Sequence, residues 1–289
     1  MANGILIIDK PQDWTSHDVV AKLRGILHEK RIGHAGTLDP MATGVLPVFV
    51  GRATRAVEFA AEREKEYIAG LQLGVVTDTQ DVTGHVLSTA PADVTREGLE
   101  AALEAFRGNI QQIPPMYSAI KKDGRKLYEL ARRGQEVERR PRPVTIYRLE
   151  ILEQLSPSAF TLRVLCSKGT YVRTLCHDIG QALGCGGTLA SLRRTRSAGF
   201  TLDQAVTLAQ VAELEDPASA LLPAEAYFTD HPALRLRNAG AEKKIRNGSS
   251  LTLDGPDGTY RVYSRAGEFL ALSKLEKGCL TTIKSFFEV

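Results

Sequence analysis

The sequence predicts an α+β protein, in which a mixed domain of strands and helices is followed by a small all-β module. Its 289 residues suggest roughly two domains. Before residue 230, segments with the two-residue period of strands occur together with segments that have helical spacing. After His231-Pro232, turn pairs divide the chain into short strands; these pairs are Asn247-Gly248, Asp254-Gly255, Asp257-Gly258 and Ala266-Gly267. We therefore expect domains at residues 1–230 and 231–289.

The N-terminal segments give the clearest local signals. The apolar run at residues 4–9 predicts a short buried strand, which ends before Pro11. Thr15 and Asp18 form a capping-box pattern, and the apolar residues that follow at helical spacing predict a helix. Glycines and Pro40 interrupt residues 31–43, where we expect no regular structure. Next we expect a strand at residues 44–50 and a short helix at 53–61.

Later elements follow from the same two periods. Residues 65–74 place alternate apolar side chains on one face, which predicts a strand that carries Tyr67. The other expected elements are helices at 95–106, at 126–133 and from about 170, an extended segment at 117–121, strands at 145–155 and 160–166, and connecting helices after Leu202.

Composition limits the cellular setting. Hydrophobic residues at 43% and charged residues at 25% are ordinary globular values and argue against a disordered chain. No apolar run approaches the length of a membrane helix, and the N-terminal residues do not resemble a secretory signal. The four cysteines form no C-x-x-C pair, so we expect reduced thiols. These features predict a cytoplasmic protein that does not bind membranes.

Charge is unevenly distributed along the chain. Residues 121–142, called the basic segment below, contain nine Lys or Arg and four acidic residues. Residues 201–232 contain six acidic residues and no Lys or Arg, although the formal net charge of the whole chain is only +3. A basic stripe of this kind is typical of polyanion binders, and a solvated surface segment is the alternative.

Several common catalytic motifs are absent from the sequence. The six histidines are scattered and predict no metal site, since none forms H-E-x-x-H or pairs with cysteines at ligand spacing. There is no G-x-x-x-x-G-K-[ST] phosphate loop, no G-x-G-x-x-G opening a helix and no G-x-S-x-G nucleophile elbow. These absences argue against NTP-driven, nicotinamide-dependent and serine-hydrolase chemistry.

The segment GHAGTLDP at residues 33–40 is the strongest local candidate for a reactive site. Proline after Asp39 favours extended backbone at the aspartate, and the nearby glycines allow another chain to approach closely. Asp39, beside His34, has the chemistry of a nucleophile or general base. A plain Asx turn before a proline is the structural alternative.

Four further residues can be interpreted from their local sequence. Tyr67 lies within a strand, where packing explains it. Tyr171 and Arg173 fall in the first turn of a helix, whose partial positive charge favours an anion. Arg173 is equally well explained as the partner of a carboxylate. Leu192 is an ordinary apolar residue by pattern.

Beyond these local signals, residues 33–48 (GHAGTLDPMATGVLPV) resemble the central motif of the TruB family, the bacterial tRNA pseudouridine-55 synthases. Further motifs occur in the family's order and spacing: Lys10-Pro11, Lys65-x-Tyr67, Thr77-Asp78-Thr79-x-Asp81-x-x-Gly84, Pro114-Pro115-x-Tyr117, Cys166-Ser167-Lys168-Gly169-Thr170-Tyr171-x-Arg173 and Leu192-Arg193-Arg194. The resemblance implies a pseudouridine-synthase fold, with a mixed, largely antiparallel sheet and flanking helices. It also implies that residues 231–289 form a PUA-like RNA-binding barrel.

The resemblance implies an activity as well. The family isomerises uridine to pseudouridine at position 55 in the TΨC arm of tRNA: the glycosidic bond breaks, the base rotates and a carbon–carbon bond forms. It implies no cofactor or metal, and it indicates no obligate protein partner. A secondary tRNA-folding activity is implied too.

By resemblance, Asp39 is the essential catalytic aspartate, and Tyr67 stacks on the flipped base and is suited to receive a proton from the ribose or base. Tyr171 and Leu192 line the substrate pocket. His34 takes the place of the target in the RNA loop.

Three other matches concern charged groups. Arg173 pairs with the catalytic carboxylate, and Asp81 with Arg132 forms an accessory network. Residues 114–143 match a flexible insertion that closes on the RNA arm. Its expected contacts with the RNA backbone come from Lys121, Lys122, Arg132, Arg139, Arg140 and Arg142.

Two other functions remain open at this stage. A non-catalytic RNA chaperone is compatible with the basic regions, and an aspartate-dependent base glycosylase is compatible with the Asp39 loop. Within the synthase reading, Asp39 has three possible targets: the base, the anomeric carbon or the ribose 2′ proton.

Overall fold

A nine-stranded sheet organises the larger part of the protein. The computed structural model describes residues 2–122 and 124–287, and within them the principal strand order is β1-β3-β12-β4-β11-β10-β7. The strands of this sheet are β1 (Gly4–Lys10), β2 (Ile32–His34), β3 (Thr43–Val50), β4 (Lys65–Leu73), β7 (Gly108–Gln112), β10 (Arg142–Ser156), β11 (Ala159–Cys166), β12 (Gly187–Ser197) and β13 (Phe200–Thr201). Neighbours pair antiparallel except β12 with β3, so the sheet is mixed and largely antiparallel, as predicted.

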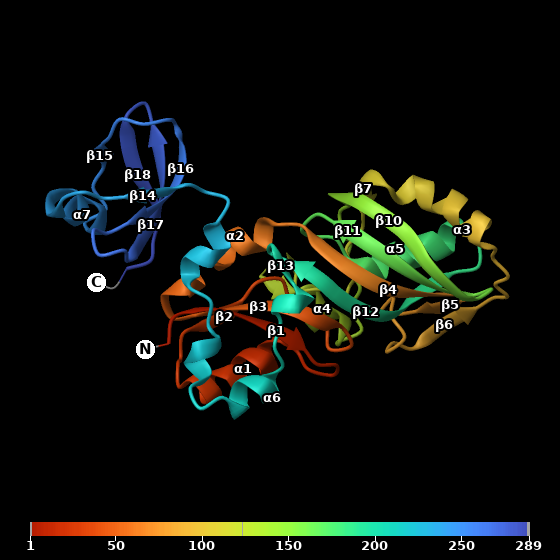
Figure 1. The fold of residues 1–289 in the computed structure, drawn as a ribbon. Coiled ribbons are helices and arrows are strands. Elements are labelled where there is room, and N and C mark those ends of the chain that lie inside the picture. The colour runs from red at the N-terminus through yellow and green to blue at the C-terminus, as the bar shows by residue number, and fades with distance from the viewer. Residues whose placement is uncertain (1, 123, 288–289) are drawn as a thin grey trace.

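Helices and two small hairpins surround this sheet (Figure 1). The α-helices are α1 (Ser16–Leu27), α2 (Val57–Glu62), α3 (Arg96–Leu103), α4 (Leu127–Ala131), α5 (Val172–Ala182), α6 (Leu208–Glu213) and α7 (Ala239–Arg246). The hairpins are β5 (Val75–Thr77) with β6 (Val86–Thr89), and β8 (Lys121–Lys122) with β9 (Arg125–Lys126). No helix in the described ranges is both long and apolar enough to cross a membrane.

The sequence of β1 explains its place in the sheet. Leu6 and Ile8 share a cluster with apolar residues of α1, whereas Ile5 and Ile7 belong to a second cluster that contains Phe49 and Phe228. Both faces of the strand are therefore covered, which accounts for its continuous apolar run. The predicted capping box is confirmed, because the side chain of Thr15 accepts from the backbone of Asp18 and Asp18 accepts from the backbone of Thr15.

The C-terminal residues form a second, five-stranded sheet. Its strands are β14 (Ala233–Arg235), β15 (Leu251–Thr252), β16 (Gly258–Tyr263), β17 (Phe269–Glu276) and β18 (Cys279–Ser285). The sheet is curled into a half-barrel and lies at the opposite end of the molecule from α3 (Figure 1). The predicted all-β module thus also contains one helix, α7, which the glycine-rich turns did not indicate.

Aromatic side chains join this module to the larger sheet. The ring of Phe228 lies 5.5 Å from that of Phe286 and 6.1 Å from that of Phe269, measured between centroids. Nη1 of Arg55 donates to the backbone and hydroxyl oxygens of Ser285, each at 2.8 Å. An apolar, partly hydrogen-bonded contact therefore holds the two sheets together.

Several element predictions need correction. A three-residue strand, β2, forms within 31–43, where no regular structure was expected, because it pairs with the end of β3. The helix expected at 53–61 is a 3-10 turn (Gly51–Ala56) followed by α2, and the helix expected at 126–133 is only α4. The strands β7 and β12 were not predicted. Asp123, counted in the basic segment, lies outside the described residues.

Two helical glycines provide a test of this packing. A Cβ on Gly180 of α5 would lie 2.1 Å from the backbone nitrogen of Gly187 in β12, whereas a Cβ on Gly25 of α1 would meet nothing within 4 Å. We expect Gly180→Ala to lower the free energy of unfolding by more than about 1 kcal/mol. Gly25→Ala should raise it by up to about 1 kcal/mol, because alanine has the higher helix propensity. Urea unfolding measures both, and equal stability of Gly180→Ala and the native chain would contradict the packing.

Candidate active site

The loop between β2 and β3 carries Asp39 at its turn. The backbone N–H of Ala42 donates to the carbonyl of Asp39 at 3.0 Å, with Pro40 at the second turn position. The turn therefore uses the main chain of Asp39 and leaves its carboxylate available. This differs from the Asx turn that was the structural alternative, in which the side chain itself would close the turn.

Buried groups anchor the loop on both sides of Asp39. The hydroxyl of Ser16, in the first turn of α1, accepts from the backbone of Leu38 at 2.8 Å. The ammonium of Lys10, a fully buried side chain, donates to the carbonyls of Pro11, Trp14 and Pro40. Burial lowers the pKa of Lys10 to about 8, although nearby carboxylates, including Asp39, oppose this effect. These contacts fix the backbone from which the carboxylate projects.

Arg173 bridges two carboxylates. Its Nε lies 3.1 Å from Oδ2 of Asp39, and its Nη1 lies 3.3 Å from Oδ2 of Asp81. The side chains of Arg173 and Asp81 are 6% and 5% exposed, whereas that of Asp39 is 40% exposed. Arg173 also donates to the carbonyls of Thr79 and Tyr117. Asp39 is thus the one member of this trio that is open to an incoming molecule.

The second carboxylate is fully occupied by protein groups. Oδ1 of Asp81 accepts from the hydroxyls of Thr79 and Thr83 and from the backbone of Thr83, at 2.5–3.0 Å. The turn that holds Asp81 is bound to β12 through two backbone hydrogen bonds at Leu189. Asp81 is therefore placed to orient Arg173, and Asp39 to meet a substrate.

The ionisation of Asp39 reflects two opposing effects. Loss of hydration raises the pKa of this carboxyl above its usual value, and the positive charge of Arg173 works against that rise. The negative charge of Asp81 adds to the rise. A carboxyl whose pKa is perturbed by burial together with a specific charged partner is a candidate for a functional site.

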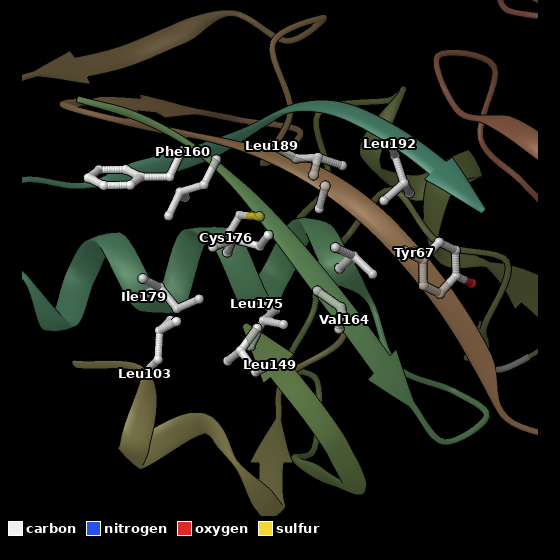
Figure 2. Packing of buried hydrophobic residues seen from close by; sticks show 14 of the residues in the cluster. Tyr67, Leu103, Leu149, Phe160, Val164, Leu175, Cys176, Ile179, Leu189 and Leu192 are labelled. Atoms are coloured by element: carbon white, nitrogen blue, oxygen red, sulfur yellow. The ribbon is translucent and has the colours of Figure 1, made fainter. Parts of the chain in front are cut away.

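Tyr67 and Leu192 lie on neighbouring strands beside this network. They share the core cluster that also contains Leu38, the residue before Asp39. Figure 2 shows both at the same end of that cluster, on β4 and β12. Burial raises the pKa of Tyr67, with Asp39 among the charges that contribute. The structure thus brings an apolar floor next to the exposed carboxylate.

Tyr171 is the N-cap of α5, not part of its first turn as predicted. Its backbone N–H donates to Oε1 of Gln112 at 2.8 Å, and its carbonyl accepts from Nε2 of Gln112 at 3.0 Å. Burial raises the pKa of the Tyr171 phenol, whereas the nearby charge of Arg173 lowers it. Gln112 was not singled out from the sequence, because a glutamine in a polar segment carries no local signal of this role.

The remaining predicted residues are spread more widely. His34 closes β2, where Nε2 lies 3.3 Å from the hydroxyl of Thr37, and burial lowers its pKa. Arg132 is exposed, and its guanidinium lies over the ring of Tyr128 at 5.4 Å. Among the described residues, the arginine that pairs with Asp81 is Arg173, and not Arg132 as predicted.

The basic segment extends from the site as a hairpin, a short helix and an irregular stretch. Of the predicted RNA contacts, Lys121, Arg132, Arg140 and Arg142 are exposed, and Lys122 and Arg139 are half-buried. Nη1 of Arg139 donates to the carbonyl of Pro114, and its Nη2 binds Glu136 at 2.7 Å. Because the carbonyl of Tyr117 accepts from Arg173, the chain leading into this segment is directly bound to the Asp39 network.

The role of Arg173 in holding Asp39 ionised predicts a shift in titration. In Arg173→Met the burial of Asp39 and its repulsion by Asp81 remain, while the compensating cation is lost, so the pKa of Asp39 should rise. Carbon-13 NMR of labelled aspartate carboxyls, assigned with Asp39→Asn, measures this pKa. Arg63→Met, which removes the partner of the distant, exposed Asp230, is the control and should leave the pKa of Asp39 unchanged.

Comparison with known proteins identifies the family. Residues 24–172 match the family described as TruB family pseudouridylate synthase (N terminal domain), and residues 173–229 match the tRNA pseudouridylate synthase B C-terminal domain. The tRNA pseudouridine synthase B of Syntrophomonas wolfei subsp. wolfei is 46% identical over 280 residues, which cover 94% of this chain and 93% of the relative. That of Francisella philomiragia subsp. philomiragia is 41% identical over 290 residues, which cover 99% and 95%.

Solved structures agree with these matches. The chain resembles one in the crystal structure of a Cbf5-Nop10-Gar1 complex, with a TM-score of 0.75 and 28% identity over 99% of this chain and 85% of that one. It also resembles one in the structure of an H/ACA RNP bound to a substrate RNA containing 2'-deoxyuridine, with a TM-score of 0.74 and 26% identity over 99% and 86%. The resemblance seen in the sequence motifs is confirmed, and the chain belongs to the TruB family of pseudouridylate synthases.

Proposed function

We propose that this pseudouridine synthase acts on tRNA and isomerises the uridine at position 55 of the TΨC arm, with Asp39 as the catalytic carboxylate. The observation that carries the proposal is the asymmetry of the Asp39–Arg173–Asp81 network. Arg173 and Asp81 are buried and bound to protein groups, whereas Asp39 is partly exposed. Only Asp39 in this network can reach a nucleoside.

The surroundings of Asp39 fit a base that has left the RNA stack. Unstacking and unpairing a nucleotide costs a few kcal/mol, and stacking on an aromatic ring returns about 1–3 kcal/mol. Tyr67 and Leu192 offer an aromatic and an apolar surface in one cluster, and Tyr171 lies at the start of the helix that carries Arg173. His34, at the other end of the Asp39 loop, is assigned to fill the vacated place in the RNA.

The ionised form of Asp39 is the form that this chemistry uses. Addition to the base, attack on the anomeric carbon and removal of the ribose 2′ proton all begin with a carboxylate that donates an electron pair. Burial raises the pKa of Asp39, and the positive charge of Arg173 favours the ionised form against that effect. Tyr67 is suited to receive a proton from the ribose or base in the same pocket.

Two basic regions are assigned to the RNA backbone. The basic segment provides Lys121, Lys122, Arg132, Arg139, Arg140 and Arg142, and residues 231–289 form the PUA-like module with ten Lys or Arg against six acidic residues. Phosphate contacts of this kind provide affinity without reading sequence. We assign the secondary tRNA-folding activity to these surfaces, and its expected place is the cytoplasm, where tRNA is processed.

Replacing Asp39 tests the proposal directly. We expect Asp39→Asn, which keeps the shape of the side chain but removes its charge, to lower pseudouridine formation by about 10²-fold or more. The measurement is tritium release from 5-tritiated uridine in an unmodified tRNA transcript, with chemical marking of pseudouridine to locate the site. Affinity for the transcript should stay within about twofold. Asp230→Asn, at an exposed carboxylate far from the loop, is the matched control.

Analysis of the released products and a tRNA-refolding assay on the native chain and Asp39→Asn separate the other functions considered. Free uracil among the products would indicate a base glycosylase. Full tRNA refolding by both proteins, with no pseudouridine made by the native chain, would indicate a chaperone alone. Unchanged tritium release by Asp39→Asn would contradict the role given to the carboxylate.

The contribution of the basic segment has a separate signature. We choose Arg140→Gln with Arg142→Gln, because both side chains are exposed, whereas Arg139 is bound to Pro114 and Glu136. The double variant should bind tRNA more weakly. The slope of log affinity against log salt concentration should be smaller in magnitude by about 1–2. Filter binding over a salt series measures this slope. Arg148→Gln with Arg163→Gln is the control, since Glu150 already pairs with both arginines.

A further inference from the structure

A second buried arginine, Arg194 of β12, plays no part in the Asp39–Arg173–Asp81 network. Its side chain is fully buried, with an exposed fraction of 0%. Within residues 2–122 and 124–287, no carboxylate forms an ion pair with it. A charge held in this way is costly unless its hydrogen-bonding groups are used, so the position needs a physical reason.

The first reason is the Asp39 loop. Nε of Arg194 donates to the carbonyl of Val45 at 2.7 Å, and Nη2 donates to the carbonyl of Gly36 at 2.8 Å. These two carbonyls lie on either side of Asp39 in the chain. One planar guanidinium therefore closes the base of the loop that presents the carboxylate.

The backbone confirms how tightly β12 meets this loop. Arg194 is paired with Gly44 in the parallel register of β12 and β3. Gly44 has a φ of +100°, and a Cβ added there would lie 2.2 Å from the carbonyl oxygen of Arg194. Only glycine fits at that point, so the loop can approach the strand closely enough for the guanidinium to reach both carbonyls.

The second reason is Tyr67. Arg194 and Tyr67 are register partners in the antiparallel pair β12 and β4, so their side chains are neighbours on one face of the sheet. The charge of Arg194 lowers the pKa of Tyr67, against the larger rise that burial causes. Nη1 of Arg194 is buried, and within residues 2–122 and 124–287 it makes no hydrogen bond of ordinary geometry. After it has bound the loop through Nε and Nη2, the guanidinium still has one nitrogen, Nη1, whose N–H groups are unused.

We propose that Arg194 is a positioning residue, which holds the Asp39 loop and the Tyr67 hydroxyl in a fixed relation through a single guanidinium. The inference rests on the roles proposed above for Asp39 and Tyr67. Lysine cannot replace it, because one ammonium group lacks the planar fork that reaches two separated carbonyls and a phenol together. Arg194 acts on the reaction through those two residues and does not itself meet the substrate.

The test compares Arg194→Lys with Arg193→Lys. The neighbour is partly exposed, pairs with Asp9 and donates to the hydroxyl of Thr43, but binds neither of the two loop carbonyls, so it is a matched control on the same strand. We measure single-turnover pseudouridine formation with enzyme in saturating excess over unmodified tRNA, together with the dissociation constant for that tRNA. Arg194→Lys should lose at least tenfold in rate with a dissociation constant within twofold of the native value, and Arg193→Lys should change neither beyond twofold.

A double-mutant cycle separates positioning from general loss of structure. Because Arg194 also binds the loop, Arg194→Lys should cost at least tenfold in the native background and a smaller but still measurable factor in the Tyr67→Phe background. An equal loss in both backgrounds would overturn the link to Tyr67 and with it the joint positioning that we propose. So would a loss in rate that matches the fraction of inactive protein, found by titrating the enzyme with tRNA.

A second readout leaves Arg194 in place, in case its replacement prevents folding. The guanidinium protons of a buried arginine exchange slowly and give separate nitrogen-15 NMR signals. The signal of Arg194 is identified by assignment of the native chain, or by its loss in Arg194→Lys where that variant folds. Tyr67→Phe should shift the Arg194 signal, and Tyr147→Phe, at an exposed tyrosine, should not. An unmoved signal overturns the link to Tyr67. Loss of activity in Asp39→Asn with full activity in Arg194→Lys would refute this inference alone, whereas an active Asp39→Asn would refute the proposed function itself.

Discussion

The site depends on one cation placed between two carboxylates. Burial and the negative charge of Asp81 raise the pKa of Asp39, and the positive charge of Arg173, which contacts both carboxylates, opposes that rise. Arg173 enters from the first turn of α5, whose helix dipole adds positive potential at that end. Because Asp81 and two carbonyls hold the guanidinium on its protein side, its remaining edge is presented to Asp39. The position of the reactive carboxylate is thus set by Arg173, which buried groups hold in place.

That arrangement also connects distant parts of the fold. The Asp39 loop lies between β2 and β3, Asp81 lies in the turn between β5 and β6, and Tyr117 precedes the basic segment. Each contributes an oxygen to Arg173. One side chain, Arg173, thus binds both the carboxylate of Asp39 and the chain that leads into the basic segment.

Much of the fold could be predicted from local patterns, because most strands and helices have one clear period. The strand β12 could not, since its sequence GTLASLRRTRS reads as a polar, basic stretch and its most deeply buried large side chain is an arginine. The edge strand β7 (GNIQQ) is polar for the opposite reason, as most of its residues are exposed. Alternation fails as a signal when a charged side chain faces inward, as in β12, or when a strand has a single apolar side chain, as Ile110 is in β7.

The site shows the same limit. Local chemistry singled out Asp39 by its glycines and proline, and it allowed Arg173 a carboxylate partner without saying which one. No spacing rule joins residues so far apart in the chain, and only the ordered family motifs brought Asp39, Tyr67, Tyr171, Arg173 and Leu192 together in advance. Gln112 was missed, and Arg194 was noted only as part of a family motif, because the roles of both depend on backbone carbonyls and amides, which sequence patterns do not reveal.

The aromatic contact between the two sheets has a consequence for how the molecule responds to stress. Phe228 belongs to the chain before the C-terminal module, yet its neighbours Phe269 and Phe286 are in that module. Neither surface is complete without the other, since separation would expose these rings to water. Within residues 2–122 and 124–287 no strand pairing joins the two sheets, so side-chain contacts of this kind connect them, and the C-terminal module covers an apolar flank of the larger domain.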